Sequence, residues 1–295
     1  MLSKATVSVP ATSANLGPGF DSLGVAFELR DRITATITNE SGVRVNITGE
    51  GSDTLPSDES HLVAKVLLEA LAQLGNEVAG VELECVNAIP QGKGLGSSAA
   101  AIVAGLALAQ ALAFDGIVDF DWVFNQATQR EGHPDNAAAC VFGGLVVAWE
   151  SDQAHCRKLS VSSELSAVVG VPSSELLTDK ARGLLPEQVP HIDAAFNAAR
   201  SALLVVGLTS DPTVLLDATQ DRLHQNYRES AYPKTISAIN NLANQGIAAC
   251  VSGAGPAVLA FAKTAQKDLA SAVLREAGFT AQGLEFADSG LIIEA

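Results

Sequence analysis

The chain has 295 residues, of which 47% are hydrophobic and 17% charged, and this composition predicts one large or two medium globular domains. Its formal net charge of -15 disfavours nucleic acid as a partner, because clustered Lys and Arg hold phosphate backbones. A small phosphate-bearing ligand remains compatible with this charge, because backbone N–H groups and a metal ion can hold phosphate.

Cysteine spacing and apolar runs predict where the protein resides. The four cysteines form no CxxC pair, which argues against a disulfide framework or a structural zinc site. The first residues, MLSKATVSVPATS, lack the apolar core of a signal peptide. The longest apolar stretch, from Ala99 to Phe114, is shorter than the ~20 residues that span a bilayer. We therefore expect a soluble, cytoplasmic protein with no membrane partner.

Taken in chain order, the first half predicts strands followed by alternating helices and strands. The predicted strands cover residues 5–10, 33–38, 43–49 and 81–88, and the predicted helices cover residues 60–74 and 98–113. Residues 39–42 separate two β-branched alternations and predict a hairpin. Gly75 is the expected C-cap of the first helix. The second helix is apolar on nearly every face, which predicts a buried position.

The second half predicts a mixture of strands and helices behind a polar stretch that follows Trp149. We place the boundary near residue 155, which gives domains 1–155 and 156–295. The predicted strands cover residues 167–171, 247–251, 258–262 and 290–294, and the predicted helices cover residues 190–206, 233–245 and 266–277. Mixed elements of this kind predict an α+β fold with helices on one face of a sheet.

The strongest chemical signal is PQGKGLGSS, residues 90–98, between a predicted strand and a predicted helix. Its alternating glycines permit positive φ and close approach of a ligand, and the helix N-terminus attracts anions. Ser98 could cap the helix or turn its hydroxyl toward a metal ion. The spacing matches neither the P-loop nor the dinucleotide fingerprint, which disfavours a Rossmann-type dehydrogenase.

The longer string P-x-x-x-G-L-G-S-S-A-A resembles the nucleotide-binding motif of the GHMP family of small-molecule kinases. The resemblance implies that this loop binds ATP and that Ser98 is a Mg²⁺ ligand. The implied ATP-binding residues are Pro90, Gln91, Gly92, Lys93, Gly94, Leu95, Gly96, Ser97 and Ser98. It also implies a two-domain α+β kinase, with a ribosomal-protein-type β-α-β domain, a ferredoxin-like C-terminal domain, an active site between them, and a possible homodimer.

The N-terminal string VPATSANLGPGFDSLG points to the second substrate. By themselves, Asn15 and Asp21 are compatible with ordinary turn-forming residues. The whole string resembles the first motif of the homoserine kinases within the family, which implies that both residues contact an amino-acid substrate. Asp21 would supply the counter-charge for the substrate ammonium.

The string EGHPDN, residues 131–136, places a carboxylate, an imidazole, a second carboxylate and an amide together. Its residues alone leave open that Asp135 and Asn136 cap a short helix after Pro134. The string resembles the same group of kinases. By that resemblance Glu131 is the second Mg²⁺ ligand, and the catalytic residues Asn136 and Asp135 lie near the reacting hydroxyl.

Three further segments in the second half extend the resemblance. Lone arginines are usually solvated, but the strings around Arg182 and Arg228 resemble those whose arginines clamp the substrate carboxylate, a task that suits a planar guanidinium. Thr178 is expected nearby, and Arg182 is also expected to spread negative charge during catalysis. The string VSGAGP, residues 251–256, resembles the third glycine motif of the family, which supports the phosphate loop.

Together these motifs predict ATP-dependent phosphorylation of the side-chain hydroxyl of L-homoserine to O-phospho-L-homoserine, a step of threonine biosynthesis. The small-molecule partners are L-homoserine and ATP, with Mg²⁺ as the metal. Two alternatives remain, another family kinase of mevalonate type and a catalytically silent ligand sensor. Asp135 and Asp21 are candidates for a general base, although a loose transition state does not require one.

Overall fold

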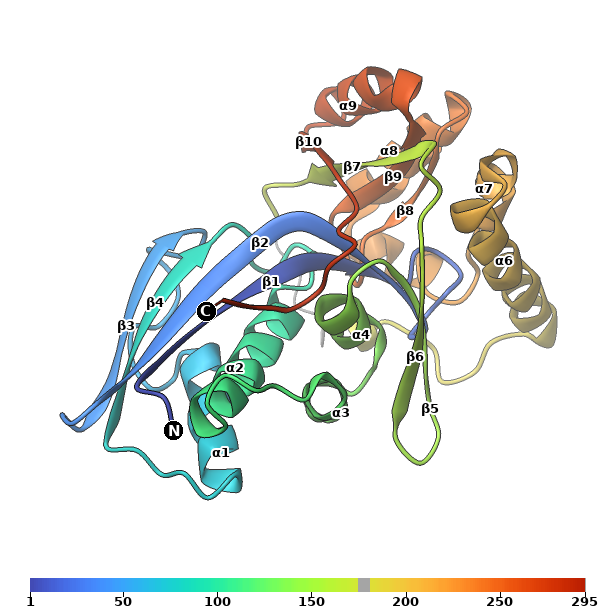
Figure 1. Ribbon diagram of the computed structural model, residues 1–295. Coiled ribbons are helices and arrows are strands. Elements are labelled where there is room, and N and C mark those ends of the chain that lie inside the picture. Colours follow the sequence, from blue (N-terminus) through green and yellow to red (C-terminus); the bar gives the residue numbers. More distant parts are fainter. Residues whose placement is uncertain (175–180, 295) are drawn as a thin grey trace.

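The computed structural model describes residues 1–174 and 181–294. Two sheets form its framework (Figure 1). The larger sheet has the order β11-β1-β2-β4-β3, with β5 beside β2 and β6 beside β5. Its strands are β1 (Lys4–Ala14), β2 (Leu23–Thr38), β3 (Gly42–Gly49), β4 (Gly80–Asn87), β5 (Leu145–Glu150), β6 (Ala154–Leu159) and β11 (Ile292–Glu294).

Four helices pack on the larger sheet or on one another (Figure 1). They are α1 (Leu62–Gln73), α2 (Ser97–Ala113), α3 (Phe120–Glu131) and α4 (Asp135–Phe142). As predicted, α2 is buried on nearly all sides, and its Gln110 side chain accepts the N–H of Asp119 at 2.6 Å. The C-cap of α1 is Leu74, one residue before the predicted Gly75, which follows it in the left-handed region with a φ of 76°. Burial on nearly all sides therefore fixes the position of α2, and its first turn faces the candidate site.

The predicted hairpin around residues 39–42 is wrong. Strand β3 does not pair with β2, because β4 lies between them and pairs antiparallel with β2. Strands β3 and β4 are parallel, with Gly42 opposite Gly80. Parallel neighbours need a crossover connection, and α1 supplies it. The local alternation of residues identified both strands, but their pairing depends on α1 and β4.

The smaller sheet is antiparallel and has the order β10-β7-β9-β8. Its strands are β7 (Leu165–Val171), β8 (Ala248–Val251), β9 (Val258–Lys263) and β10 (Thr280–Leu284), and its covering helices are α8 (Pro233–Asn244) and α9 (Lys267–Glu276). This order and the two helices on one face confirm the ferredoxin-like prediction. Strand β10 was not predicted, because the short TAQGL segment has no clear apolar alternation.

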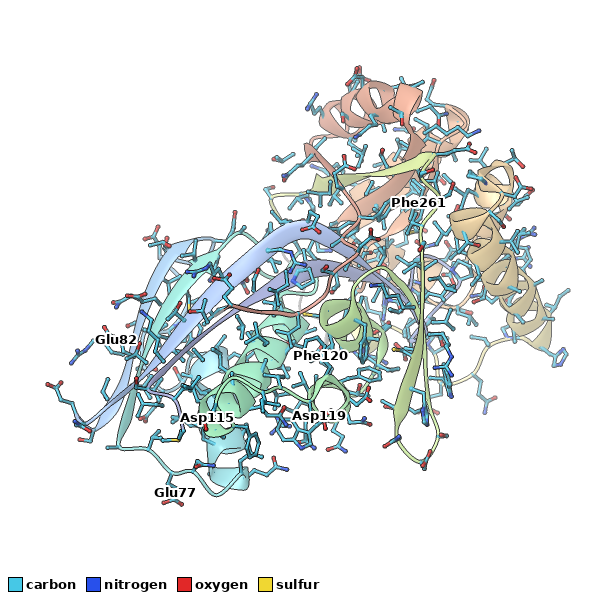
Figure 2. All side chains as sticks on the ribbon, viewed as in Figure 1. Glu77, Glu82, Asp115, Asp119, Phe120 and Phe261 are labelled. Carbon is cyan, nitrogen blue, oxygen red and sulfur yellow. The ribbon has the colours of Figure 1, made fainter. Side chains whose placement is uncertain are left out.

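Strand β9 joins the two halves through its alternating side chains. Val258, Ala260 and Ala262 pack with α8 and α9 in a small core. Phe261, which is labelled in Figure 2, alternates with these residues and belongs to the main core, which also contains residues of the larger sheet. The shared core therefore stabilises the arrangement of the two sheets.

The chain crosses between the two sheets more than once. Strand β6 begins at Ala154 and pairs with β5 in the larger sheet. The final strand β11 returns to pair with β1, with Val7 opposite Ile293. A division at residue 155 would separate β6 and β11 from the sheet to which they belong. The predicted domain boundary stays a prediction.

Helix α6 (His191–Thr209) lies at the surface beside α7 (Leu215–Ala218) (Figure 1). Among the described residues, α6 alone has the length and hydropathy that a membrane span needs, with a mean hydropathy of 1.3. It also carries two charged residues that form ion pairs, Asp193 with Arg222 and Arg200 with Asp217. Charged residues are costly inside a bilayer, so these pairs favour a surface helix.

Candidate active site

A cavity of about 510 Å³ lies where the two sheets meet the N-terminus of α2. Residues of both halves line it, including the phosphate loop, Asp135 of α4, Arg228 and Gly253. Glu131, Asn136, Asp21, Asn15 and Arg182 also line it. The cavity therefore brings together most of the predicted site residues, but Pro90, Lys93 and Leu95 of the loop are not part of its lining. Thr178 lies outside the described residues.

The phosphate loop takes the backbone conformation that its glycines predict. Gly92, Gly94 and Gly96 have φ values of 63°, 83° and 71°. Gly96 is the N-cap of α2, and no side chain caps this helix. The predicted capping role of Ser98 is therefore not observed. The N–H groups of the first turn stay available to an anion at the positive end of the helix dipole.

The third glycine motif supports this loop, as predicted. The hydroxyl of Ser252 lies 2.6 Å from the carbonyl oxygen of Gly94 and 2.9 Å from the hydroxyl of Ser13. The N–H of Ala257 donates to the carbonyl oxygen of Lys93 at 3.1 Å. A Cβ atom on Gly94 would lie 2.2 Å from the carbonyl oxygen of Ser252. Close backbone contact between the halves therefore requires glycine here.

The side chain of Lys93 is engaged outside the cavity. Its Nζ donates to the carbonyl oxygens of Ser173 and Ser174, both at 3.0 Å, and the residue is not part of the cavity lining. This ammonium therefore ties the phosphate loop to the segment after β7. A direct contact of Lys93 with ATP stays a prediction.

Ser98 and Glu131 lie together beside the phosphate loop. The Ser98 hydroxyl donates to Glu131 Oε1 at 2.7 Å. Glu131 ends α3, and Gly132 follows in the left-handed region with a φ of 77°. A hydroxyl and a carboxylate are oxygen ligands of the kind that Mg²⁺ prefers. The pair therefore fits the metal site that the sequence predicts.

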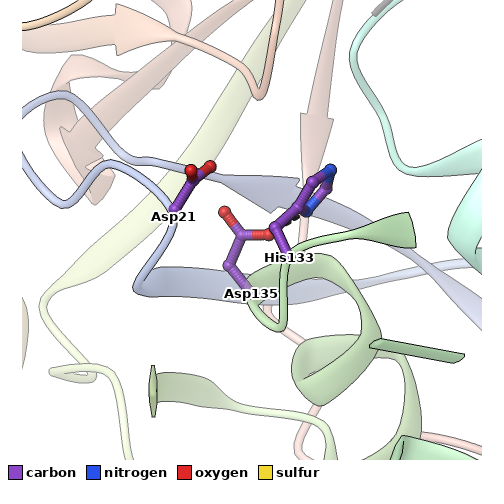
Figure 3. Close-up of side chains that lie close together, drawn as sticks. All are labelled: Asp21, His133 and Asp135. Carbon is purple, nitrogen blue, oxygen red and sulfur yellow. Dashed lines mark hydrogen bonds and ion pairs between the residues drawn. The ribbon is translucent and has the colours of Figure 1, made fainter. Parts of the chain in front are cut away.

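His133 links the two carboxylates of the EGHPDN string. Its Nδ1 lies 2.8 Å from Asp135 Oδ1, and its Nε2 lies 4.0 Å from Glu131 Oε2 (Figure 3 shows the Asp135 contact). Burial alone would lower the pKa of His133, but the neighbouring Asp135 carboxylate raises it above its usual value. No role was predicted for His133, although its place in the sequence between Glu131 and Asp135 was a usable signal.

Asp135 and Asn136 are the first two residues of α4, and both face the cavity. The predicted capping role is not observed, because Pro134 is the N-cap and no side chain caps this helix. Asp135 Oδ1 accepts the N–H of Asn136 at 2.8 Å, which adds to its contact with His133. The side-chain oxygen of Asn136 accepts the hydroxyl of Thr12 at 2.8 Å. This bond directs the Asn136 amide, whose nitrogen has no recorded hydrogen bond within the described residues.

Asn15 and Asp21 form a tight turn at the cavity. Both have positive φ, 66° and 54°, and such strain persists only where neighbours hold the backbone. The Asn15 side-chain oxygen accepts the N–H of Asp21 at 3.0 Å, and its nitrogen donates to the carbonyl oxygen of Gly253 at 2.9 Å. Asn15 therefore holds Asp21 in place. A contact of Asn15 with substrate stays a prediction.

Arg182 and Arg228 meet on the ring of Phe20. Their guanidinium carbons lie 5.5 and 5.7 Å from its centroid. Arg182 binds Asp21 through two nitrogens, at 2.6 and 3.2 Å. Arg228 is 1% exposed, and burial lowers its pKa. The two arginines therefore form a cationic end of the cavity, with Asp21 beside one of them.

A buried network fixes Arg228. Its Nε donates to the carbonyl oxygen of Ala181 at 2.9 Å, and its Nη1 lies 3.2 Å from Nδ1 of His224. The opposite ring nitrogen of His224 lies 2.8 Å from the carbonyl oxygen of Gly17. Asp221 accepts the backbone N–H of His224 at 3.0 Å. The string around Arg228 thus positions one guanidinium at the substrate end.

Sequence reasoning missed two polar residues in the cavity. His61 lines the cavity, and its buried Nδ1 has no hydrogen bond in the described part of the chain. Asp31 also lines the cavity and accepts the N–H groups of Ala88 and Ile89, at 2.7 and 2.9 Å. Neither stands in a recognisable motif, so only the fold could reveal them.

Comparison with known proteins identifies the family. The model for the GHMP kinase N-terminal domain matches residues 61–144, and the model for the C-terminal domain matches residues 213–279. A homoserine kinase from Streptomyces avermitilis is 49% identical over 265 residues, covering 89% of this chain and 87% of that relative. The chain belongs to the GHMP kinase family. It is therefore a kinase, and enzymes of this family take their phosphoryl group from ATP.

One further relative and two solved structures resemble the chain to different degrees. A homoserine kinase from Cutibacterium acnes is 44% identical and covers 94% of this chain and 95% of its own length. The crystal structure of homoserine kinase from Cytophaga hutchinsonii matches with a TM-score of 0.87 at 28% identity, over 100% of this chain and 98% of that chain. Phosphomevalonate kinase from Streptococcus pneumoniae, 14% identical with a TM-score of 0.71 over 96% and 100% of the two chains, shares the fold alone.

Proposed function

We propose that this GHMP kinase transfers the γ-phosphoryl group of ATP to the side-chain hydroxyl of L-homoserine. The product is O-phospho-L-homoserine, an intermediate of threonine biosynthesis. The observation that carries the proposal is the convergence of Asp21, Arg182 and Arg228 in the cavity that also contains Ser98 and Glu131. An amino acid with a hydroxyl side chain matches these charges. Several relatives named homoserine kinase at 42–49% identity support the same substrate.

The proposed roles follow from the contacts. The N–H groups of the phosphate loop and of the first turn of α2 bind phosphate oxygens. Ser98 and Glu131 would hold Mg²⁺, which neutralises charge that develops on the phosphates. Asn136, directed by Thr12, orients the acceptor hydroxyl, and Arg182 balances negative charge. Phosphoryl transfer through a loose transition state needs mainly such positioning and charge stabilisation.

Asp135 is better placed to orient its neighbours than to act as a general base. Its Oδ1 already accepts hydrogen bonds from the N–H of Asn136 and from His133 Nδ1, so this oxygen has two partners within the protein. We propose that the Asp135–His133 pair positions Asn136 and the Glu131 carboxylate. A general base is not required for this account.

Product analysis tests the proposal. The protein is incubated with ATP, Mg²⁺ and L-homoserine, and the products are examined by proton-coupled ³¹P NMR. A phosphate ester split by the two hydrogens of a side-chain CH₂ group is the expected product. Release of inorganic phosphate alone, or no turnover, would contradict the proposal.

Two alternatives are disfavoured by specific residues. A kinase of mevalonate type has no substrate ammonium for Asp21 to bind. A silent sensor has no need for the contact between Ser98 and Glu131. A cytoplasmic location and a homodimer complete the proposal, and both depend on the properties of homoserine kinases.

A further inference from the structure

Asp21 and Arg182, which we assign to the ammonium and the carboxylate of the substrate, bind each other in this structure. Arg182 Nη2 and Nη1 lie 2.6 and 3.2 Å from the two carboxylate oxygens of Asp21. This is the bidentate geometry that favours guanidinium–carboxylate pairs. Both side chains line the cavity. Each group therefore already has a partner of the charge that the proposed substrate would bring.

The backbone holds one member of the pair in place, and both members are accessible from the cavity. The backbone N–H of Asp21 donates to the side-chain oxygen of Asn15 at 3.0 Å, which holds the turn that carries the carboxylate. The side chains of Arg182 and Asp21 are 37% and 34% exposed, so a solute in the cavity can reach both members of the pair. Asp21 therefore keeps its position when Arg182 exchanges it for another anion.

Arg228 gives the cavity a second positive charge that the pair does not balance. Within residues 1–174 and 181–294 no carboxylate forms an ion pair with Arg228, and the carbonyl of Ala181 and the ring of His224 hold its guanidinium. It shares the Phe20 ring with Arg182. A carboxylate that enters this end is attracted to both guanidinium groups.

We propose that Asp21 and Arg182 pair with each other in the free protein and that a zwitterionic substrate replaces this contact when it binds. The substrate ammonium replaces Arg182 at Asp21, and the substrate carboxylate replaces Asp21 at Arg182, next to Arg228. The exchange leaves no charge unpaired, which removes the main cost of breaking an ion pair. The inference rests on the proposed function, because it takes the phosphoryl acceptor to be an α-amino acid.

This exchange selects for acceptors that carry both charges. 4-Hydroxybutanoate has the hydroxyl and the carboxylate of homoserine, but at Arg182 it would leave Asp21 unpaired. 3-Aminopropan-1-ol has the hydroxyl and the ammonium, but at Asp21 it would leave Arg182 beside Arg228 without a counter-charge. The unpaired charge weakens the binding of both analogues. The site therefore gains specificity by making the wrong acceptors unfavourable.

The test measures kcat/KM for homoserine and the two analogues in the wild-type protein and in the variants Asp21→Asn and Arg182→Met. Asp21→Asn releases Arg182, so the preference for homoserine over 4-hydroxybutanoate should fall by ~10-fold or more. Arg182→Met releases Asp21, so the preference for homoserine over 3-aminopropan-1-ol should fall similarly. Asp268→Asn, at an exposed position on α9, is the control and should change neither preference.

The outcomes separate this inference from the proposed function. A purely structural role would lower kcat/KM for all three acceptors by the same factor in each variant, and that result would overturn the exchange. A wild-type protein that does not phosphorylate homoserine would instead remove the proposed function. Binding of homoserine measured by calorimetry gives a second readout, because the exchange requires each variant to lose affinity for homoserine and to keep its fold by circular dichroism.

Discussion

Asp31 shows how one buried carboxylate can serve the site at a cost to stability. It is 6% exposed, and burial raises its pKa from 3.8 to about 6, partly opposed by the N–H groups of Ile89 and Ala88. These N–H groups lie immediately before the phosphate loop. The carboxylate therefore fixes the start of the loop while its own charge is poorly solvated.

We predict that Asp31→Asn changes the pH dependence of stability. Because the folded pKa is above the unfolded value, this carboxyl group favours the fold below about pH 3.8, and that contribution is lost as the pH rises through about 6. Asparagine keeps an oxygen that can accept the two N–H groups, and it does not ionise, so its contribution to stability does not fall as the pH rises. Relative to the wild type, the variant should gain up to ~3 kcal/mol of unfolding free energy between pH 4 and pH 7.

Chemical denaturation at the two pH values measures this gain, with Asp268→Asn as the exposed control. An equal difference between Asp31→Asn and the wild type at pH 4 and pH 7 would show that Asp31 does not titrate with a raised pKa.

Glu131 is the residue on which the metal assignment depends. We predict that Glu131→Gln lowers kcat by ~100-fold and raises the Mg²⁺ concentration needed for half-maximal activity, because an amide is a weaker ligand than a carboxylate. The thermal midpoint should change little, since the Ser98 hydroxyl can still donate to the amide oxygen. Glu164→Gln, at an exposed position before β7, is the control. Normal activity and Mg²⁺ dependence in Glu131→Gln would refute the assignment.

At the scale of elements, the phosphate loop needs glycine for two separate reasons. One is a positive φ, and the other is the lack of space for a side chain. Gly96 has a φ of 71°, and a Cβ atom there would lie 2.0 Å from Thr12 Oγ1 and 3.2 Å from Asn136 Oδ1. Gly75 has a similar φ of 76°, but a Cβ atom there would meet nothing within 4 Å. A side chain at Gly75 would therefore meet backbone strain alone, whereas one at Gly96 would meet both backbone strain and a steric clash.

We therefore predict that Gly75→Ala and Gly96→Ala differ sharply. Both should lose ~1–2 kcal/mol of unfolding free energy through backbone strain. Gly96→Ala should lose more and should also raise KM for ATP, because its Cβ atom meets Thr12 at the N-terminus of α2, whose first-turn N–H groups are proposed to bind phosphate. Denaturation curves and steady-state kinetics measure both effects. Equal stability and equal KM for the two variants would contradict the steric argument.

Contiguous motifs were predictable, whereas contacts between distant segments were not. The phosphate loop and the EGHPDN string each place their functional groups within a few residues, so the sequence displays them together. Asp21 and Arg182 are 161 residues apart, and nothing in either string indicates that they bind each other. The failure at residues 39–42 has the same cause, because strand pairing is decided by β4, far along the chain.

At the scale of the whole molecule, the site exists because two sheets share a core. Asp21 follows β1 of the larger sheet, while Arg228 precedes α8 of the smaller one. The main core that contains Phe261 joins the two halves. The composition predicted one large or two medium domains, but neither it nor the periodicity could predict that the last strand returns to the first sheet.

The arrangement predicts that Arg228 acts on the amino acid and not on the nucleotide. Arg228→Leu should raise KM for homoserine by ~10-fold or more, because a charged hydrogen-bonding partner of the carboxylate is lost. KM for ATP should change little. Arg222→Leu, which removes a partly exposed arginine paired with Asp193, is the matched control. Steady-state kinetics with each substrate varied in turn measures both KM values. An unchanged KM for homoserine would place Arg228 outside the substrate site.

The most direct test of the whole account is the release of ADP with ATP and Mg²⁺ in the presence of L-homoserine, mevalonate, galactose or L-serine. The account predicts rapid release with homoserine and little with the other three, because only homoserine combines both charges with a hydroxyl at the right distance. Preferential turnover of mevalonate or galactose would contradict the assignment of Asp21, Arg182 and Arg228. Nucleotide binding without turnover of any acceptor would favour a ligand sensor.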